Sequence, residues 1–338
     1  MKILFLGADS ADYLNISILN GLISLQDISL FCYPAPNLLF KSNQSTYAAS
    51  VRGGGFSIFF NHPDQTQFTE HYLHDKIQSN FFDVIIIGDI FSSYIFYPWV
   101  GSFASIYPNK IIVLDGADQE NIFPFSGAIL SNLYQSFFPR LHKKHHYFKR
   151  ELTYRSIQSC FYMLIPRFIA KNLKFHNNLH PISFAFPSEK ITHHKDLIKS
   201  KLYTKHVVDE GLIDFIPGAM SSYAFQNEAE YFHDIQISKF GITTKRSGWD
   251  CLRHYEIAAN GAIICFKNLH LKPSSCAPHG LVAGVNCISY VDYNDLNTQI
   301  TELNSNLYNA MLKKSYAWIT SKTSEKLARE VIAVTTKS

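Results

Sequence analysis

The stretch of sequence that decides the fold is residues 238–266, SKFGITTKRSGWDCLRHYEIAANGAIICF. It begins with an apolar run that ends near Thr244, passes through a polar loop with a glycine, and enters a short segment of helix-forming residues. Gly261 stands where such a helix would end, and residues 262–266 form a second apolar run. A strand, a loop, a helix and another strand in this order predict one unit of a parallel α/β sheet.

The polar loop of this unit is suited to an anion. We expect the helix to start near residues 249–250, so that free backbone N–H groups and the positive end of its dipole point at the loop. Lys245 and Arg246 add full positive charges beside it, and Arg253 and Glu256 share one helix face because they are three residues apart. The pattern predicts a diphosphate near the helix start and a ribose held by Glu256. The alternative is an ordinary surface pair between Arg253 and Glu256.

Short apolar runs recur along the whole chain, and most of them end in Gly, Asp or Pro. Because they are continuous rather than alternating, they predict strands that are buried on both faces, as in parallel sheets. In the first half we expect strands at 2–6, 28–32, 84–87 and 111–114 and crossover helices at 13–24 and 70–78. In the second half we expect strands at 212–216, 235–242, 262–266 and 287–290 and a helical tail over 295–335. The fold class is therefore α/β, with two Rossmann-like domains that face a cleft.

A polar stretch over residues 187–205 separates the two series of strands. We place the domain boundary there, with an N-terminal Rossmann-like domain over 1–190 and a C-terminal one, with closing helices, over 191–338. A chain of 338 residues fits two domains of ordinary size. Ligands of open α/β sheets bind beyond the carboxyl ends of the strands, so the polar residues that follow each strand are the first candidates for a site.

The composition of the chain limits the classes of partner that we expect. Hydrophobic residues make up 46% of the chain, which argues against disorder, and a net charge of +4 does not indicate a nucleic-acid partner. The residues at 140–150 form a local basic cluster, which fits a solvated face, a phosphate contact or peripheral docking on an anionic membrane. The amino-terminal apolar run is too short for a signal peptide, and no stretch approaches the roughly 18 apolar residues of a membrane span. We expect a cytoplasmic protein, with contact at the inner membrane surface left open.

The second half resembles a known family. Arg253 and Glu256 on a helix, a small-residue turn that ends at Gly261 and the apolar strand at 262–266 are similar to the donor-binding segment of GT-B-fold glycosyltransferases, especially the spore-maturation-like and group 1-like branch. Shorter segments at 115–118, 147–151, 284–290, 292–296 and 323–328 also resemble that branch. The resemblance implies a nucleotide-sugar donor, with Glu256 on its ribose, and a last helix that crosses back to the first domain. The donor-binding residues that we predict are Lys245, Arg246, Gly248, Asp250, Arg253, Glu256 and Gly261.

One position departs from the family pattern, and the catalytic base is not obvious. Many retaining members carry a second Glu eight residues before the ribose Glu, where this chain has Gly248. The stereochemistry of transfer therefore stays open. Five aspartates follow expected strands and are candidates for the base, although each also fits a turn or a helix cap; they are Asp9, Asp12, Asp89, Asp115 and Asp118. We select Asp9 and Asp118 as the candidate catalytic residues.

Several motifs are missing from the sequence. It has no D-x-D triplet, no G-x-G-x-x-G after the first strand, no phosphate-binding P-loop and no G-x-S-x-G, so metal-dependent transferases, dehydrogenases, ATPases and esterases are disfavoured. The predicted function is the transfer of a hexose-type sugar from a nucleotide-sugar donor to a glycan or glycolipid acceptor in polysaccharide biosynthesis, with no metal and no cofactor. The alternatives are a nucleotide-sugar epimerase or hydrolase on the same fold, and a non-catalytic two-domain module that binds a ligand.

Overall fold

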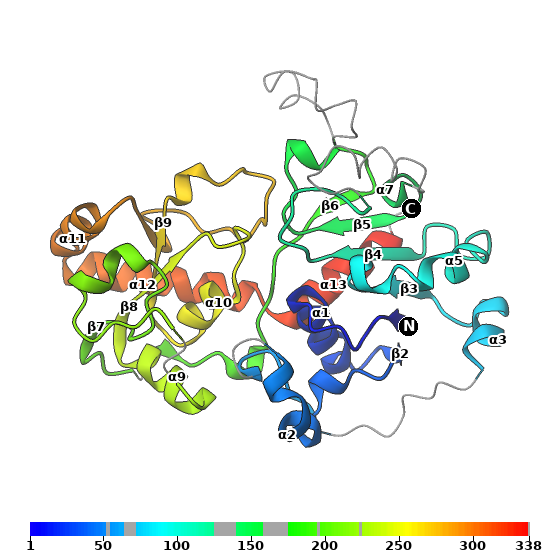
Figure 1. The fold of residues 1–338 in the computed structure, drawn as a ribbon, viewed down its shortest axis with the longest axis horizontal. Helices are drawn as coiled ribbons and strands as arrows, with labels where there is room; N and C mark the ends of the chain where they lie inside the picture. Colours follow the sequence, from blue (N-terminus) through cyan, green and yellow to red (C-terminus); the bar gives the residue numbers. More distant parts are fainter. Residues whose placement is uncertain are drawn as a thin grey trace.

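Two parallel sheets, one in each half of the chain, organise the protein (Figure 1). The computed structural model describes residues 1–51, 55–63, 72–124, 140–157, 175–194, 197–222 and 225–336. The predicted α/β class with two Rossmann-like domains is confirmed, because every strand pair in both sheets is parallel and helices connect the strands.

The first sheet has the strand order β2-β1-β3-β4-β5-β6. Its strands are β1 (Lys2–Leu6), β2 (Ser29–Tyr33), β3 (Val84–Ile87), β4 (Ile111–Asp115), β5 (His146–Lys149) and β6 (Leu179–Pro181). The central strands β3 and β4 are buried along their whole length, as their continuous runs of Ile, Val and Leu predict. The order reverses between β1 and β3, and such a switch point is where open α/β sheets bind ligands.

Helices connect these strands. They are α1 (Tyr13–Ser24), α2 (Gln44–Tyr47), α3 (Leu73–Gln78), α4 (Ile90–Ser93), α5 (Phe96–Gly101) and α7 (Leu141–Lys144). The side chain of Asp12 caps α1 by accepting the backbone N–H of Asn15 at 2.9 Å, and so it satisfies one of the free donors at the helix start. Of the helix that we expected at 70–78, the first two residues lie outside the described part of the chain.

The second sheet has the order β10-β9-β8-β7. Its strands are β7 (Lys201–Tyr203), β8 (Ser238–Thr244), β9 (Ile263–Lys267) and β10 (Cys287–Tyr290), and the helices α9 (Glu228–Gln236) and α10 (Leu252–Ala259) lie along the chain on either side of β8. The unit β8–α10–β9 is the strand, loop, helix and strand that residues 238–266 predict.

Two strand expectations about this half are wrong. Residues 212–216 are not a strand, because Glu210–Phe215 forms a 3₁₀ helix whose start is capped by Asp209. Leu212 and Ile216 are buried while the two residues before Ile216 are exposed, which is a helical rather than an extended pattern. The strand expected at 235–242 begins only at Ser238, because α9 continues to Gln236. The edge strand β7 lies in the polar stretch that we assigned to the boundary.

The tail forms three helices, α11 (Tyr293–Glu302), α12 (Ser305–Ser321) and α13 (Ser324–Ala333). The helix α13 leaves the second half and packs against α1 of the first, as the blue and red ribbons show in Figure 1. The contact is close, because a Cβ atom added to Gly21 of α1 would lie 2.0 Å from the carbonyl oxygen of Ser324. The crossing that the family resemblance implies is thus present, and one hydrophobic cluster continues through both halves.

Candidate functional site

A cavity of about 730 Å³ lies between the two halves. Its walls are the loops that follow β1 and β4 in the first sheet, the loop that follows β8 in the second, and the first turn of α10. These are carboxyl ends of parallel strands, where α/β sheets bind ligands, and the volume falls within the range of roughly 300–1,000 Å³ that is usual for small-molecule pockets.

Asp12 is one of two carboxylates, with Asp118, on the first wall of the cavity. Its pKa is raised to about 6, first by burial and then by repulsion from Asp89, while the N–H of Asn15 and the charge of Arg150 act in the opposite direction. Asp89 follows β3, and the hydroxyl of Ser10 donates to it at 2.7 Å. A carboxylate with a raised pKa in a cleft is suited to accept a proton near neutral pH.

The two aspartates that we selected from sequence lie in different places. Asp118 lines the cavity and accepts a hydrogen bond from the guanidinium group of Arg150, with which it forms an ion pair. Asp9 is exposed and does not belong to the cavity lining. Asp12, which the sequence placed among five candidates, occupies the position toward the cavity instead.

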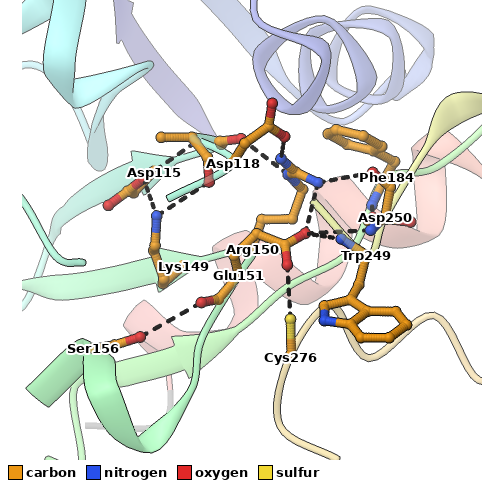
Figure 2. Close-up of polar contacts among 12 residues, drawn as sticks. Asp115, Asp118, Lys149, Arg150, Glu151, Ser156, Phe184, Trp249, Asp250 and Cys276 are labelled. Atoms are coloured by element: carbon orange, nitrogen blue, oxygen red, sulfur yellow. Dashed lines mark hydrogen bonds and ion pairs between the residues drawn. The ribbon is translucent and has the colours of Figure 1, made fainter. Parts of the chain in front are cut away.

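Two segments that resemble the family in sequence interlock in space (Figure 2). The ammonium group of Lys149 donates to the carboxylate of Asp115 at 2.8 Å, and both side chains are fully buried. The hydroxyl of Tyr147 donates to the other oxygen of Asp115 at 2.5 Å. Arg150 donates through Nε to the carbonyl of Gly116 at 2.9 Å. Residues 115–118 and 147–151 therefore form one structural unit at the carboxyl ends of β4 and β5.

The basic residues of the cluster at 140–150 differ in their exposure to solvent. Lys149 and Arg150 point inward, with 0% and 1% of their surfaces exposed, so they cannot meet a membrane surface. Lys143 and Lys144 are exposed on α7. A docking role for the whole cluster is therefore corrected to these two lysines, and it remains a prediction.

The second wall of the cavity carries two arginines, Arg246 from the loop after β8 and Arg253 from α10. Arg253 lies with Nη1 3.5 Å from Nε2 of His206. Burial and the charge of Arg253 lower the pKa of His206 to about 4, so the imidazole is neutral at pH 7 and does not repel the guanidinium group. Lys245 is exposed outside the lining, with its ammonium group 5.3 Å from the ring centre of Trp249.

The start of α10 differs from the sequence expectation. The helix begins at Leu252 rather than near residues 249–250. The backbone N–H groups of Trp249 and Asp250 are not free for a phosphate, because both donate to Oε1 of Glu151, at 2.9 and 3.2 Å. This difference arises from tertiary structure. The first half of the chain supplies the Glu151 carboxylate to backbone N–H groups that the local sequence alone would leave without a partner.

Asp250, Gly248 and Gly261 are also predicted donor residues. Asp250 lines the cavity, but its carboxylate accepts the N–H of Phe184 at 2.7 Å and the hydroxyl of Tyr255 at 3.1 Å, and burial raises its pKa to about 6. Gly248 lines the cavity, whereas Gly261 ends α10 at a positive φ of 73° and does not line it.

Glu256 is buried on α10 and is not part of the cavity lining. Its Oε2 accepts the hydroxyl of Tyr231 at 2.7 Å, and its Oε1 accepts the hydroxyl of Ser57 from the first half. The backbone N–H of Ser57 donates in turn to Glu228 of α9. We call this contact of Ser57 with Glu228 and Glu256 the serine clasp. Both carboxylate oxygens of Glu256 thus accept hydrogen bonds within the protein, and its role in binding the donor ribose stays a prediction.

Sequence reasoning passed over Arg150 and Glu151 as site residues. Arg150 was counted in the basic cluster, yet its guanidinium group lines the cavity and lies 4.6 Å from the ring centre of Phe184. Both residues directly follow β5. The rule that polar residues after a strand are site candidates would have found them had β5, with its sequence HYFK, been recognised as a strand.

No protein-family model matches the sequence, and no curated protein matches it significantly. Solved structures do match. Anabaena HepE in complex with UDP-glucose aligns over 100% of both chains with a TM-score of 0.52 at 12% identity, and HepE in complex with UDP gives a TM-score of 0.53 over the same coverage and identity. A glycosyltransferase from Rickettsia africae aligns over 99% of this chain and 98% of its own, with a TM-score of 0.52 at 8% identity.

The chain has the GT-B fold. The fold that the resemblance implies is therefore confirmed, while identities this low establish the fold alone. In this GT-B arrangement the cavity occupies the cleft between the two Rossmann-like domains. Among the described residues no helix is long and apolar enough to cross a membrane, and no group of three or more His, Cys, Asp or Glu residues is placed to hold a metal ion.

Proposed function

We propose that this protein is a glycosyltransferase that moves a sugar from a nucleotide-sugar donor to a hydroxyl group of a glycan or glycolipid acceptor. The observation that carries the proposal is the opposition of charge across the cavity. The carboxylate of Asp12 lies on the wall of the first domain, and the guanidinium groups of Arg246 and Arg253 lie on the wall of the second. A base facing a cationic wall is what displacement of a diphosphate by a hydroxyl requires.

The second domain is the donor side in this proposal. Departure of a nucleoside diphosphate leaves negative charge on the β-phosphate, which Arg246 and Arg253 neutralise by charge-assisted hydrogen bonds. The start of α10, an eight-residue helix, adds its dipole in the same direction. We propose that these groups act without a metal ion. The complex of HepE with UDP-glucose, a protein of the same fold, supports the choice of donor class.

Asp12 is the proposed base on the acceptor side. The acceptor hydroxyl gives its proton to the Asp12 carboxylate, its oxygen forms the new bond to the anomeric carbon, and the bond from that carbon to the diphosphate breaks with the electron pair leaving on the diphosphate. Asp118 is less suited to the proton transfer because Arg150 already neutralises its carboxylate. A single displacement of this kind inverts the anomeric configuration, which product analysis by NMR can determine.

The test is thermal stabilisation by a panel of UDP, GDP, CMP, ADP and dTDP in the presence of EDTA. A ligand that binds only the folded protein at a hundred times its dissociation constant adds about 2.7 kcal/mol to the free energy of unfolding, which is an easily measured shift. We expect a response to one nucleotide and little response to free sugars. A response only when Mg²⁺ is supplied would contradict the metal-free mechanism, and equal responses to free sugars would favour a sugar-binding module.

Two neighbouring residues provide a matched pair of variants for the same measurement. Arg246 lines the cavity and Lys245 does not, although both are exposed basic residues of one loop. Arg246→Ala is expected to weaken nucleotide binding about 10- to 100-fold, because a hydrogen bond between charged groups contributes about 1.5–3 kcal/mol. Lys245→Ala is expected to change it less than threefold. Equal losses for the two variants would show that the diphosphate does not lie in this cavity.

A further inference from the structure

The carboxylate of Glu151 is a meeting point of both domains (Figure 2). Only 2% of this residue is exposed. Its Oε1 accepts Nη1 of Arg150 at 2.8 Å and the backbone N–H groups of Trp249 and Asp250, and its Oε2 accepts the thiol of Cys276 at 2.8 Å. Three of these four donors belong to the second domain, so a single anion of the first domain holds two separate segments of the second.

Backbone contacts on both sides of Glu151 strengthen this junction. The N–H of Ala277 donates to the carbonyl of Arg150 at 2.7 Å, and the hydroxyl of Ser275 donates to the carbonyl of Leu152 at 2.9 Å. Nη1 of Arg150 also donates to the carbonyl of Asp250 at 2.9 Å. The segment 150–152 therefore lies against both the loop after β8 and the loop after β9.

The absence of a side chain at Gly248 allows the two domains to come this close together. A Cβ atom at residue 248 would lie 2.5 Å from Oε1 of Glu151, 2.8 Å from Nη1 of Arg150 and 2.9 Å from Oδ1 of Asp118. Gly248 is not among the residues with positive φ, so space rather than backbone conformation requires glycine here. The space beside residue 248 is thus filled by Glu151, Arg150 and Asp118 of the other domain.

We propose that Glu151 is a positioning residue that fixes the turn at residues 248–250 against the first domain. Arg246 precedes this turn and Arg253 follows it, so the turn sets where both guanidinium groups stand relative to Asp12 across the cavity. Glu151 does not itself touch the substrate, because it is buried and outside the cavity lining. Its structural role is independent of the proposed function, and only the effect on transfer rests on that function.

Variants of residue 151 distinguish the effect of the carboxylate charge from the effect of side-chain length. Glu151→Ala removes the acceptor and leaves two backbone N–H groups without a partner. Glu151→Asp keeps the charge beside Arg150 but withdraws the carboxylate by one methylene group, so it no longer reaches the turn. Glu151→Gln keeps an acceptor at the same reach and is the conservative variant. Glu325→Asp is the control, because the half-buried Glu325 accepts the hydroxyl of Ser188 at 2.8 Å in the first turn of α13 and makes no contact with the turn at 248–250.

Hydrogen exchange of the whole protein, followed by mass spectrometry without any ligand, tests the structural part. We expect Glu151→Ala and Glu151→Asp to speed exchange in peptides that cover 249–250 and 277 at least tenfold, with β1 and β4 unchanged. Glu151→Gln and Glu325→Asp should stay within threefold of the wild type. If the alanine variant does not fold, the aspartate variant gives the answer, and wild-type exchange at 249–250 in a folded aspartate variant would overturn the proposal.

Kinetics with the nucleotide sugar of the responding nucleotide test the effect on transfer. We expect Glu151→Asp to raise the KM for the donor and to lower kcat, because the arginines lose their placement, and Glu151→Gln to restore most of both. A change in stability alone, with kcat and KM of the folded enzyme unchanged, would overturn the positioning role. Absence of any transferase activity in the wild type, together with the predicted exchange pattern, would contradict the proposed function and leave the junction at Glu151 standing.

Discussion

At the scale of single residues, Asp12 affects the stability of the fold in two opposite ways. Its side chain caps α1, which stabilises the helix, while burial and Asp89 raise its pKa from 3.8 to about 6. A raised pKa means that the folded state binds the proton more tightly than the unfolded chain, so the contribution of Asp12 to stability falls as the pH rises between about 4 and 6. Above that range the ionised carboxylate is a cost to the fold, as is common for groups kept for chemistry.

Asp12→Asn should therefore separate activity from stability. Asparagine also caps helices well and carries no charge to repel Asp89. We expect a loss of kcat of about 10²- to 10⁴-fold, the usual contribution of a general base, with a melting temperature at pH 7.5 equal to or above that of the wild type. In the wild type, kcat/KM should fall as the pH drops below about 6, because the base becomes protonated. Retained activity in the variant, or retention of configuration in the product, would remove Asp12 from the role of base.

The donor loop shows how far residue-level prediction reaches. Of the predicted donor residues, Arg246, Gly248, Asp250 and Arg253 line the cavity. Their grouping follows from one loop and one helix turn, which periodicity can place. What could not be predicted is the partner that arrives from the other half of the chain. Glu151 meets the turn from about 100 residues away, and Ser57 meets Glu256 from 199 residues away.

At the scale of elements, strands were predicted well where they are central and poorly where they are short. Runs such as 84–87 and 111–114 are buried on both sides, and they contain only Ile, Val and Leu. The run at 212–216 has similar composition but forms a 3₁₀ helix. Four or five apolar residues fit a strand and a helical turn equally, so flanking caps such as Asp209 decide the outcome.

The serine clasp ties elements of the two domains and makes its own prediction. Ser57→Ala removes the hydroxyl that Oε1 of Glu256 accepts in a buried site, and we expect the free energy of unfolding to fall by about 1–3 kcal/mol. Ser79→Ala is the control, because the hydroxyl of Ser79 donates to the carbonyl of Lys76 in its own exposed turn. Urea unfolding of the two variants measures the difference. Equal stability of both variants would show that the clasp does not hold the domains together.

The same variant informs the predicted ribose role of Glu256. If a donor ribose and Ser57 compete for this carboxylate, removal of the hydroxyl should tighten nucleotide binding in the folded protein. If Glu256 serves the clasp alone, the affinity should stay the same or fall. Nucleotide titration of Ser57→Ala therefore tests the predicted contact between Glu256 and the donor ribose.

At the scale of the whole molecule, the GT-B fold joins its halves twice, through the cleft and through the tail. Two parallel sheets could be predicted from the apolar runs, because buried parallel strands leave a plain signal. The path of α13 back to the first domain has no such signal, since an amphipathic helix does not specify which surface it covers. We predicted that crossing from the family resemblance, and the structure shows α13 packed closely on α1.

The packing of α13 on α1 yields a test in which two glycines are compared. A Cβ atom at Gly21 would lie 2.0 Å from the carbonyl oxygen of Ser324 and 2.8 Å from Cβ of Ala328, so Gly21→Ala must push the helices apart. We expect a loss of about 1–3 kcal/mol in the free energy of unfolding, as is typical for overpacking. At Gly101 in α5 the nearest atoms are 3.8 Å away, so Gly101→Ala should be neutral or slightly stabilising. Urea unfolding distinguishes the two. If Gly21→Ala is as stable as Gly101→Ala, then α13 does not rest on α1, and the tail cannot be what joins the second domain to the first.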